Sequence, residues 1–232
     1  MKYILIFVFA LGCVMNTNAQ VDKYKDLMSQ DWPNLKKYRA DNEKVIAADK
    51  KIKAVFMGNS ITEGWANMHP DFFTANNYLG RGISGQTTPQ MLIRFTPDVL
   101  DLNPKVVVIL AGTNDIAGNT GFSSEKMIED NITAMALLAK SHHIKVILCS
   151  ILPVYDYPWR PGLEPIQKIS NINNWMKNFA KKNGFHYLDY YSEMVNDQKG
   201  MKANLSKDGV HPNSAGYDVM EPLVIKAVNK II

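Results

Sequence analysis

The sequence predicts a single α/β domain in which helices cover both faces of a parallel sheet. The first observation is a series of short runs rich in β-branched or aromatic residues: IKAVFM (52–57), KVVVIL (105–110), KVILCSIL (145–152), FHYLDY (185–190) and the weaker NNYLGRGI (76–83). The second is a set of helix-like segments between and after these runs, at 89–102, 123–141, 165–183 and 213–231. Apolar strands that alternate with amphipathic helices are typical of a three-layer α/β domain. The 232 residues, 46% of them hydrophobic, are enough for one sizeable core.

The N-terminus has the pattern of an export signal. Lys2 precedes an apolar run that ends at Met15, and Ala19 is a small residue at which a signal peptidase could cut. The run is shorter than the roughly 20 residues that span a bilayer, so we expect no stable membrane insertion. Lipid attachment at Cys13 is the alternative that we consider less favoured. The expected organisation is a signal peptide at 1–19, a helical arm at 20–51 and a main domain at 52–232, in a protein that is periplasmic or secreted.

Charge and cysteine content exclude two further classes of protein. The formal net charge of +4 is small and scattered along the chain, which argues against a nucleic-acid partner. Cleavage after the signal would leave Cys149 as the remaining cysteine, so no internal disulfide could form. Because Cys149 lies in an apolar run, we expect it to be a small buried hydrophobic residue.

The loops that follow the predicted strands contain most of the polar candidates. In open parallel sheets, ligands bind beyond the carboxyl ends of the strands. The segments at that edge are MGNSITEG (57–64), RGISGQTT (81–88), AGTNDIAGN (111–119) and PVYDYPWRPG (153–162), and SKDGVHPNSAG (206–216) precedes the last helix. A functional site is therefore expected where these loops meet.

Ser60 has two interpretations when it is considered alone. Ser60 and Glu63 form the S-x-x-E pattern of a capping box, which suits a junction between a strand and a helix. The other interpretation is a catalytic nucleophile, which needs an imidazole to accept its proton and a carboxylate to orient that imidazole. Asp208 and His211 are spaced to supply this pair.

The other candidates also have structural alternatives. The segment with Asp208 and His211 could be only a turn before a helix cap at Asn213 or Ser214, and Asn114 could be a turn former. What favours a site is that the serine, a glycine-rich turn, the asparagine and the Asp/His pair all fall on loops of one sheet edge.

Several patterns point to chemistry that we do not expect. Residues 80–85 fit G-x-G-x-x-G, but they follow the second strand and have no acidic partner about 20 residues further on, so a dinucleotide site is disfavoured. The sequence has no G-x-S-x-G nucleophile elbow. His142 and His143 point about 100° apart on a helix and cannot hold one ion from one face. His69 and His186 have no obvious partner at ligand spacing in the sequence, so we expect surface or packing roles for both. No zinc pattern is present, and we expect no metal and no cofactor.

Four blocks in order resemble the SGNH hydrolases, also called GDSL lipases and esterases: GNSITEG, RGISGQT, GTND and DGVHP. The resemblance extends from about residue 52 to the C-terminus. It implies a flavodoxin-like fold with five parallel strands and a catalytic domain at 52–232. It also implies that Ser60 is the nucleophile, His211 the base and Asp208 its orienting acid.

The same resemblance implies an oxyanion hole made by the backbone N–H groups of Ser60 and Gly85 and by the side chain of Asn114. One departure is visible, because Asn59 stands where the family commonly has aspartate. Asn59 can keep a hydrogen bond but not the charge, which leaves its effect on the neighbouring serine open.

The expected function is hydrolysis of a small-molecule or saccharide ester through an acyl-enzyme. The loop at 153–165 contains Tyr155, Tyr157, Trp159 and Arg160, whose flat rings and hydrogen-bond donors suit a sugar better than a lipid chain. We therefore expect the removal of short acyl groups, acetyl above all, from carbohydrate-like substrates. The alternatives are a lysophospholipase or thioesterase and, from another class, a non-catalytic carbohydrate-binding relative. The sequence predicts no particular oligomeric state.

Overall fold

The computed structural model describes residues 25–26 and 29–232, so the expected export signal and Cys13 lie outside the described residues. The chain divides into two units after Asn34. In the described part of the first unit, the Ser29 hydroxyl donates to the Asp26 carbonyl (2.9 Å) and the Asn34 N–H to the Asp31 carbonyl (2.8 Å). Among the described residues, no helix is long and apolar enough to cross a membrane.

The second unit is built on a sheet of five parallel strands in the order β2-β1-β3-β4-β5. The strands are β1 (Ala54–Gly58), β2 (Tyr78–Gly82), β3 (Val106–Leu110), β4 (Lys145–Cys149) and β5 (His186–Leu188). This order and the parallel pairing are those of flavodoxin-like folds, as the resemblance to the SGNH hydrolases implies. Because β1 lies between β2 and β3, the connection from β1 leads to one side of it and the connection from β2 leads back to its other side. A crevice is expected where these two connections diverge, at the carboxyl ends of β1 and β3.

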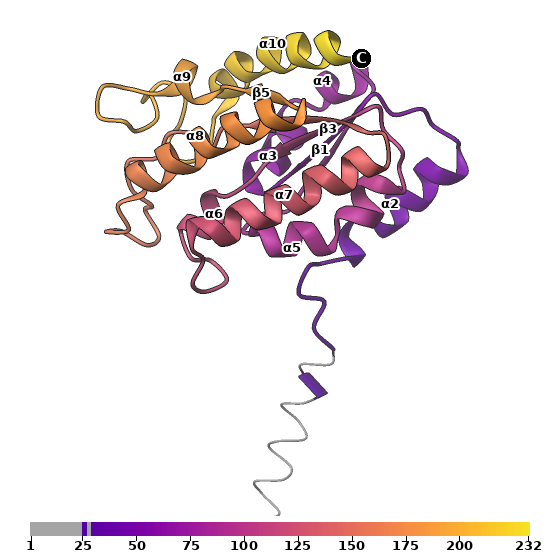
Figure 1. Cartoon of the computed structure of the whole chain (residues 1–232), viewed down its shortest axis with the longest axis horizontal. Helices are drawn as coiled ribbons and strands as arrows, with labels where there is room; N and C mark the ends of the chain where they lie inside the picture. Colours follow the sequence, from indigo (N-terminus) through magenta and orange to yellow (C-terminus); the bar gives the residue numbers. More distant parts are fainter. Residues whose placement is uncertain (1–24, 27–28) are drawn as a thin grey trace, which may run out of the picture. The chain divides into compact units, whose positions relative to one another are not determined.

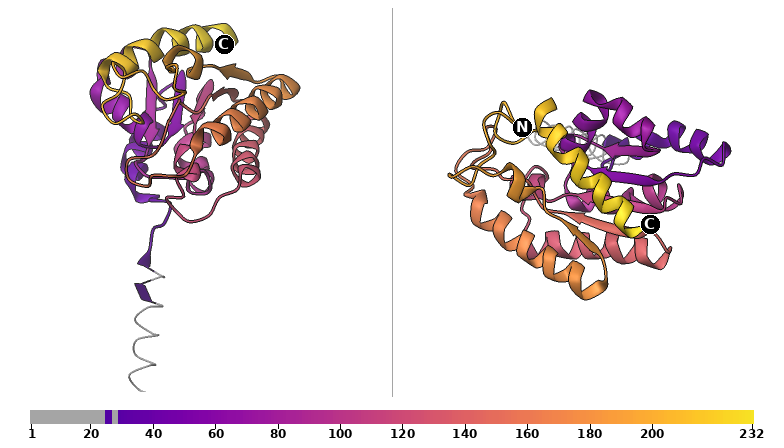
Figure 2. Two further views of the ribbon diagram at one scale, coloured as in Figure 1. Left: turned by 90° about the vertical axis from the view of Figure 1, so that its left-hand side faces the viewer. Right: turned by 90° about the horizontal axis from the view of Figure 1, so that it is seen from above.

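The strands are buried on both faces because their residues alternate between two separate cores. In β3, Val107 and Ile109 face one core, and Val106 and Val108 face the other. The first core packs under α2 (Lys36–Ala47), α5 (Thr88–Ile93), α7 (Glu125–Ser141) and α8 (Pro165–Asn183). The second packs under α3 (Ser60–Met68), α4 (Pro70–Ala75), α9 (Tyr191–Met194) and α10 (Ser214–Ile231). Figures 1 and 2 show α7 and α8 on one side of the strands and α10 on the other.

The helix predicted at 89–102 is interrupted. It forms α5 and then a separate π-helical turn, η1 (Thr96–Leu100). Pro97 explains the break, since a proline has no N–H to continue the hydrogen-bond ladder of an α-helix. A further short helix, α6 (Thr113–Ile116), directly follows β3 and contains Asn114.

The helical arm is represented in the second unit by α2. Its Val45 and Asn42 are buried, and Val45 joins the first core. α2 therefore packs on the sheet domain at the side of η1 and β2, where Asn42 bonds to Asp98 and to Arg81.

Cys149, at the end of β4, is completely buried in the second core. Burial raises the pKa of its thiol well above the usual range, because the thiolate would lie in apolar surroundings. The prediction of a small buried hydrophobic residue at this position is confirmed.

Candidate active site

Ser60 is the first residue of α3, directly after β1. The preceding Asn59 caps the helix, since its side-chain oxygen accepts the Ile61 N–H at 3.0 Å. Of the two interpretations of Ser60, the capping box with Glu63 is therefore excluded: Ser60 lies inside the helix with its hydroxyl turned to His211, and Glu63 is bonded to Lys37 and Ser84. Asn59, which replaces the common family aspartate, uses its side-chain oxygen as the cap and is itself buried.

Ser60, His211 and Asp208 form a continuous hydrogen-bonded chain. The Ser60 hydroxyl lies 2.8 Å from His211 Nε2, and His211 Nδ1 lies 2.7 Å from Asp208 Oδ2. Ser60 and His211 are 151 positions apart in the sequence. The fold brings them together with Asp208, as the sequence predicts. In this geometry the imidazole can take the proton of the serine while the carboxylate fixes its tautomer.

The carboxylate of Asp208 is held in place by the backbone that follows it. Its Oδ1 accepts the N–H groups of Val210 (2.9 Å) and His211 (2.8 Å). Burial opposes the ionised form, but these bonds and the bond from the His211 ring outweigh it and lower the pKa of Asp208 to about 2. The anion that stabilises a protonated His211 is therefore present throughout the neutral range.

The turn at 83–86, which we call the glycine turn, follows β2 and lies against the start of α3. Gly85 has φ +77° and open space where a Cβ would stand, so its position favours glycine and leaves its face accessible. The Asn114 amide donates to the Gln86 carbonyl at 2.9 Å, which joins the loop after β3 to this turn. Gly82 is packed so closely on the backbone of Asn59 and Glu63 that a Cβ there would collide with it.

Arg94, from the end of α5, is a residue that the sequence reasoning missed. Its side chain is completely buried and donates to the carbonyl of Gly58 (2.8 Å), to that of Arg81 (2.9 Å) and to Gln86 Oε1 (2.6 Å). Asp98 neutralises it at 2.8 Å. Arg94 thus ties the ends of β1 and β2 to the glycine turn. An arginine preceded by apolar residues in an amphipathic segment gave no signal of this role.

Asp115 lies next to Asn114 and is also buried. Its carboxylate accepts the Thr88 N–H at 3.0 Å and the Thr88 hydroxyl at 2.6 Å. Burial raises the pKa of Asp115 to about 6, and the bonds from Thr88 oppose the rise. The pair joins the start of α5 to α6.

The aromatic loop after β4 divides into buried and exposed parts. Tyr157 is completely buried and its hydroxyl lies 3.0 Å from that of Thr113, so the expectation that Tyr157 contacts substrate is wrong: it fills the core below the loop. Arg160 donates to the carbonyls of Ala117 (3.0 Å) and Gly118 (2.7 Å), so it fastens the loop after α6.

Two aromatic rings of this loop remain accessible. Trp159 is 45% exposed, and its ring centre lies 6.0 Å from that of His211. The indole N–H donates to Asn119 Oδ1 at 3.2 Å, which fixes the orientation of the ring. Tyr155 is 62% exposed and has its Cβ close to Gly200. Trp159 is therefore the aromatic candidate that lies beside the triad.

A hollow of about 640 Å³ opens beside the triad. Asp208 and His211 line it together with apolar surface from Met68, Pro212 and Ala215. Because His211 returns its proton to the leaving oxygen of an ester, a leaving group would lie on the histidine side of the serine. This hollow can therefore receive part of a substrate.

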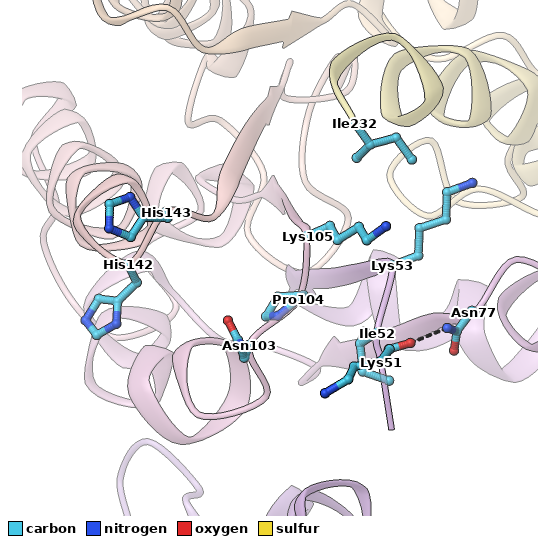
Figure 3. A pocket seen from close by; sticks show the side chains of 10 residues that line it. All are labelled: Lys51, Ile52, Lys53, Asn77, Asn103, Pro104, Lys105, His142, His143 and Ile232. Atoms are coloured by element: carbon cyan, nitrogen blue, oxygen red, sulfur yellow. Dashed lines mark hydrogen bonds between the residues drawn. The ribbon is translucent and has the colours of Figure 1, made fainter. Parts of the chain in front are cut away.

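A second hollow of about 630 Å³ lies at the other edge of the sheet, where the strands begin (Figure 3). Lysines and histidines line it, among them Lys53, Lys105, His142 and His143. α7 ends directly before His142, as expected of a helix end, and Lys53 donates to Asn229 of α10 at 2.9 Å. Basic groups are favourable at the negative ends of helices, which accounts for their presence at this edge.

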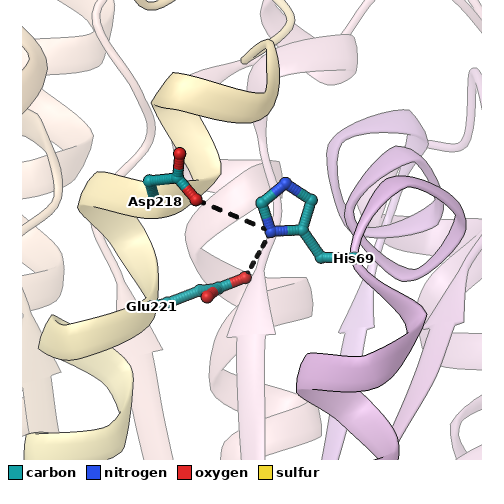
Figure 4. A group of neighbouring side chains, drawn as sticks. All are labelled: His69, Asp218 and Glu221. Atoms are coloured by element: carbon teal, nitrogen blue, oxygen red, sulfur yellow. Dashed lines mark hydrogen bonds and ion pairs between the residues drawn. The ribbon is translucent and has the colours of Figure 1, made fainter.

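His69 is less isolated than the sequence suggests (Figure 4). Its Nδ1 lies 2.6 Å from Glu221 Oε1 and 3.9 Å from Asp218 Oδ1, and its Nε2 lies 2.8 Å from the Ser214 hydroxyl. The expectation that His69 has no partner at ligand spacing is therefore wrong, because these partners come from α10, about 150 residues away. The ligand atoms of His69, Asp218 and Glu221 lie within 4.8 Å of one another, and a cation would bind them by displacing the bond between His69 and Glu221.

Together, the flavodoxin-like sheet and the Ser–His–Asp chain at its carboxyl edge define the class of serine hydrolases that act on acyl groups. The profile of the GDSL-like lipase/acylhydrolase family matches residues 56–219. Because this match covers more than half of the chain, the protein belongs to the GDSL-like lipase/acylhydrolase family, a family of carboxylic ester hydrolases.

Two solved structures are similar to this chain over most of its length. The chain is 48% identical to a protein from Bacteroides fragilis NCTC 9343, with a TM-score of 0.83 over 87% of this chain and 99% of that one. It is 46% identical to a GDSL-like lipase from Bacteroides thetaiotaomicron VPI-5482, with a TM-score of 0.82 over 87% and 100% of the two chains.

A curated relative is an acetylxylan esterase from Xylanibacter ruminicola. It is 27% identical over 89% of this chain and 48% of that protein. The chain spans less than half of the length of the curated relatives that it matches.

Proposed function

We propose that this protein hydrolyses carboxylic esters through an acyl-enzyme on Ser60 and that it removes short acyl groups, acetyl above all, from carbohydrates. The observation that carries the proposal is the hydrogen-bonded chain of Ser60, His211 and Asp208 at 2.8 and 2.7 Å. His211 accepts the serine proton as Ser60 attacks the ester carbonyl, and it then protonates the leaving alcohol. Water then attacks the acyl-enzyme while His211 accepts its proton, and His211 protonates the Ser60 oxygen as the acyl–serine bond breaks and the acid leaves.

The oxyanion that forms during attack needs donors that are already in place. In our proposal these donors are the N–H groups of Ser60 and Gly85 and the amide of Asn114. Ser60 also stands at the N-terminus of α3, whose helix dipole favours negative charge. Asn114 would leave or share its bond to the Gln86 carbonyl when the oxyanion forms.

Trp159 supports a carbohydrate as the substrate. Its exposed ring lies beside His211, on the side of the site where the leaving alcohol would be protonated, and aromatic faces suit the apolar faces of sugar rings. The likeness to an acetylxylan esterase supports the same substrate class. We also propose that the protein is exported, on the basis of the signal pattern at 1–19.

The test compares p-nitrophenyl acetate, decanoate and palmitate and then measures acetate release from acetylated xylan, with Ser60→Ala as the blank. We expect the acetate ester to be preferred and the xylan to be deacetylated. Trp159→Ala should raise KM for the saccharide several-fold with little change in kcat, and Trp159→Phe should retain most of the affinity because a ring remains. Preference for the palmitate ester, or no release of acetate from the glycan, would overturn the substrate class.

A second candidate function is hydrolysis of a lysophospholipid. The observation that favours it is the hollow beside His211, in which Met68, Pro212 and Ala215 supply an apolar wall. In this alternative the substrate binds in the opposite orientation, with its acyl chain and not its leaving group in the hollow. Met68→Ser would then lower the rate for the decanoate ester and leave the rate for the acetate ester unchanged. If Met68→Ser and wild type had the same rate on each ester, the hollow would be excluded as a chain-binding site.

A further inference from the structure

The glycine turn is held from both of its ends, and both sets of contacts lead back to α2. Gly85 lies between Ser84 and Gln86, and its own φ of +77° is a conformation that a glycine enters and leaves easily. Within the turn, the Gln86 N–H bonds weakly to the Ile83 carbonyl at 3.3 Å. A donor that must be preorganised on such a turn needs support from outside it.

Glu63 supports the turn at Ser84. One oxygen of its carboxylate accepts both the backbone N–H (2.7 Å) and the hydroxyl of Ser84. The other oxygen pairs with the ammonium of Lys37, from the first turn of α2. Burial opposes the ionised form of Glu63, but the bonds from Lys37 and Ser84 outweigh it and lower the pKa of Glu63 below its usual value. Glu63 is therefore a fixed anion three residues after Ser60.

Arg94 supports the turn at Gln86. Its guanidinium donates to Gln86 Oε1 at 2.6 Å and to Asp98 at 2.8 Å. Asp98 in turn accepts the amide of Asn42, from α2, at 2.7 Å. All four of these side chains are buried, so the path from α2 to the glycine turn is shielded from water.

α2 also holds the strand that leads into the turn. The Tyr38 hydroxyl donates to the Gly82 carbonyl, and the Arg81 guanidinium lies 4.7 Å from the centre of the Tyr38 ring. Arg81 donates to Asp41 (2.6 Å) and to Asn42 (2.9 Å). Residues 37, 38, 41 and 42 lie on one face of a helix, so a single surface of α2 makes these contacts.

We propose that α2 is part of the catalytic apparatus as a positioning element, and that Glu63, locked by Lys37, is the residue through which it aims the Gly85 N–H at the oxyanion. The inference rests on the proposed ester hydrolysis at Ser60. Glu63 touches no reacting atom and acts through Ser84. Since a misplacement of about 1 Å can lower a rate by about 10²-fold, loss of this support should appear in kcat.

The experiment measures kcat and KM for p-nitrophenyl acetate and for the corresponding thionoester, in wild type, Glu63→Ala, Glu63→Gln and Lys37→Met. A donor that is aimed at an oxyanion favours the oxygen ester over the sulfur analogue, so the ratio of the two rates reports the hole and not the amount of folded enzyme. We expect Glu63→Ala to lower kcat by about 10- to 100-fold with KM nearly constant, and to lower the oxygen-to-sulfur ratio.

A second substitution, at Lys37, should restore part of the kcat that Glu63→Gln loses. In Glu63→Gln the new amide still accepts from Ser84 but presents its NH₂ group to the Lys37 ammonium. The double variant Glu63→Gln with Lys37→Met removes this conflict and should recover part of the lost kcat. Lys126→Met, which breaks the exposed pair with Asp130 on α7, is the matched control and should leave both rates unchanged.

Two results would overturn the inference. One is a Glu63→Ala enzyme with an unchanged oxygen-to-sulfur ratio, even if it is less stable, because α2 would then only hold the fold together. The other is a double variant no better than Glu63→Gln. Failure of the proposed function itself is distinguishable, because wild type would then show no hydrolysis that depends on Ser60.

Discussion

The second unit contains two Ser–His–acid constellations with nearly equal hydrogen-bond lengths. In the first, Ser60 and His211 are 2.8 Å apart and His211 and Asp208 are 2.7 Å apart. In the second, the corresponding distances from Ser214 to His69 and from His69 to Glu221 are 2.8 and 2.6 Å. Distances within the triad alone therefore do not distinguish a catalytic set from a structural one.

The two sets differ in what surrounds the serine and the acid. Ser60 stands at the meeting point of the strand ends, with the glycine turn packed against its helix. Ser214 is exposed at the start of α10. The Glu221 oxygen that is bonded to His69, Oε1, also accepts the indole N–H of Trp65 at 3.2 Å. Asp208 instead is fixed by two backbone N–H groups. The two sets therefore differ in their position on the sheet and in how the acid is held, and not in the distances within each triad.

The largest difference between the two sets is expected when each serine is removed in turn. Ser60→Ala should lower kcat by about 10⁶-fold, the effect of losing a serine nucleophile, while Ser214→Ala should stay within about twofold of wild type. A fluorophosphonate probe followed by peptide mapping should label Ser60 alone. Label on Ser214 in the Ser60→Ala protein would show that the second set is also reactive.

The two acids should differ almost as strongly. Asp208→Asn should lower kcat by about 10⁴-fold, because the imidazole is then held in the wrong tautomer. Glu221→Gln should instead lower the melting temperature with kcat nearly constant, since it weakens the link between α3 and α10. Steady-state kinetics with thermal unfolding of the same samples checks both. A large loss of kcat in Glu221→Gln would place His69 in the reaction.

Asn114 tests the role of the surrounding donors. Asn114→Ala should lower kcat by about 10²- to 10³-fold with little change in KM, which is the usual effect of removing one oxyanion donor. Asn171→Ala, which removes an exposed amide on α8, is the control. If Asn114→Ala kept its kcat, the donors for the oxyanion would have to lie elsewhere.

A further effect is expected in the pH dependence of stability and not in the rate. The pKa of Asp115 rises from 3.8 to about 6 on folding, so its stabilising contribution is present below 3.8 and is lost as pH rises through about 6. That difference corresponds to about 3 kcal/mol. Asp208, with a pKa of about 2, acts in the opposite direction, and its contribution is present above 3.8 and lost toward pH 2. Urea unfolding at a series of pH values should show the fall between 3.8 and about 6 disappear in Asp115→Asn.

The fold and the triad could be predicted because their signals are local. Each strand is a short apolar run, and Ser60, Asn114 and the Asp208/His211 pair lie in loops that a parallel sheet brings to one edge. The support of the glycine turn could not be predicted. Asn42 meets Asp98 across 56 residues, and Glu63 meets Ser84 across 21, and no short pattern records such pairs. The prediction that Tyr157 contacts substrate failed for the same reason, because only the packing of the loop decides which ring turns inward.

The buried thiol of Cys149 offers a way to measure how often the sheet opens. A thiol reagent attacks the thiolate, and neither reagent nor water reaches this sulfur while β4 stays covered by the second core. Labelling can therefore proceed no faster than the sheet opens there. In a chain that begins after Ala19, and so keeps Cys149 but not Cys13, the labelling rate at excess reagent would report the lifetime of the closed sheet in plain buffer, without denaturant.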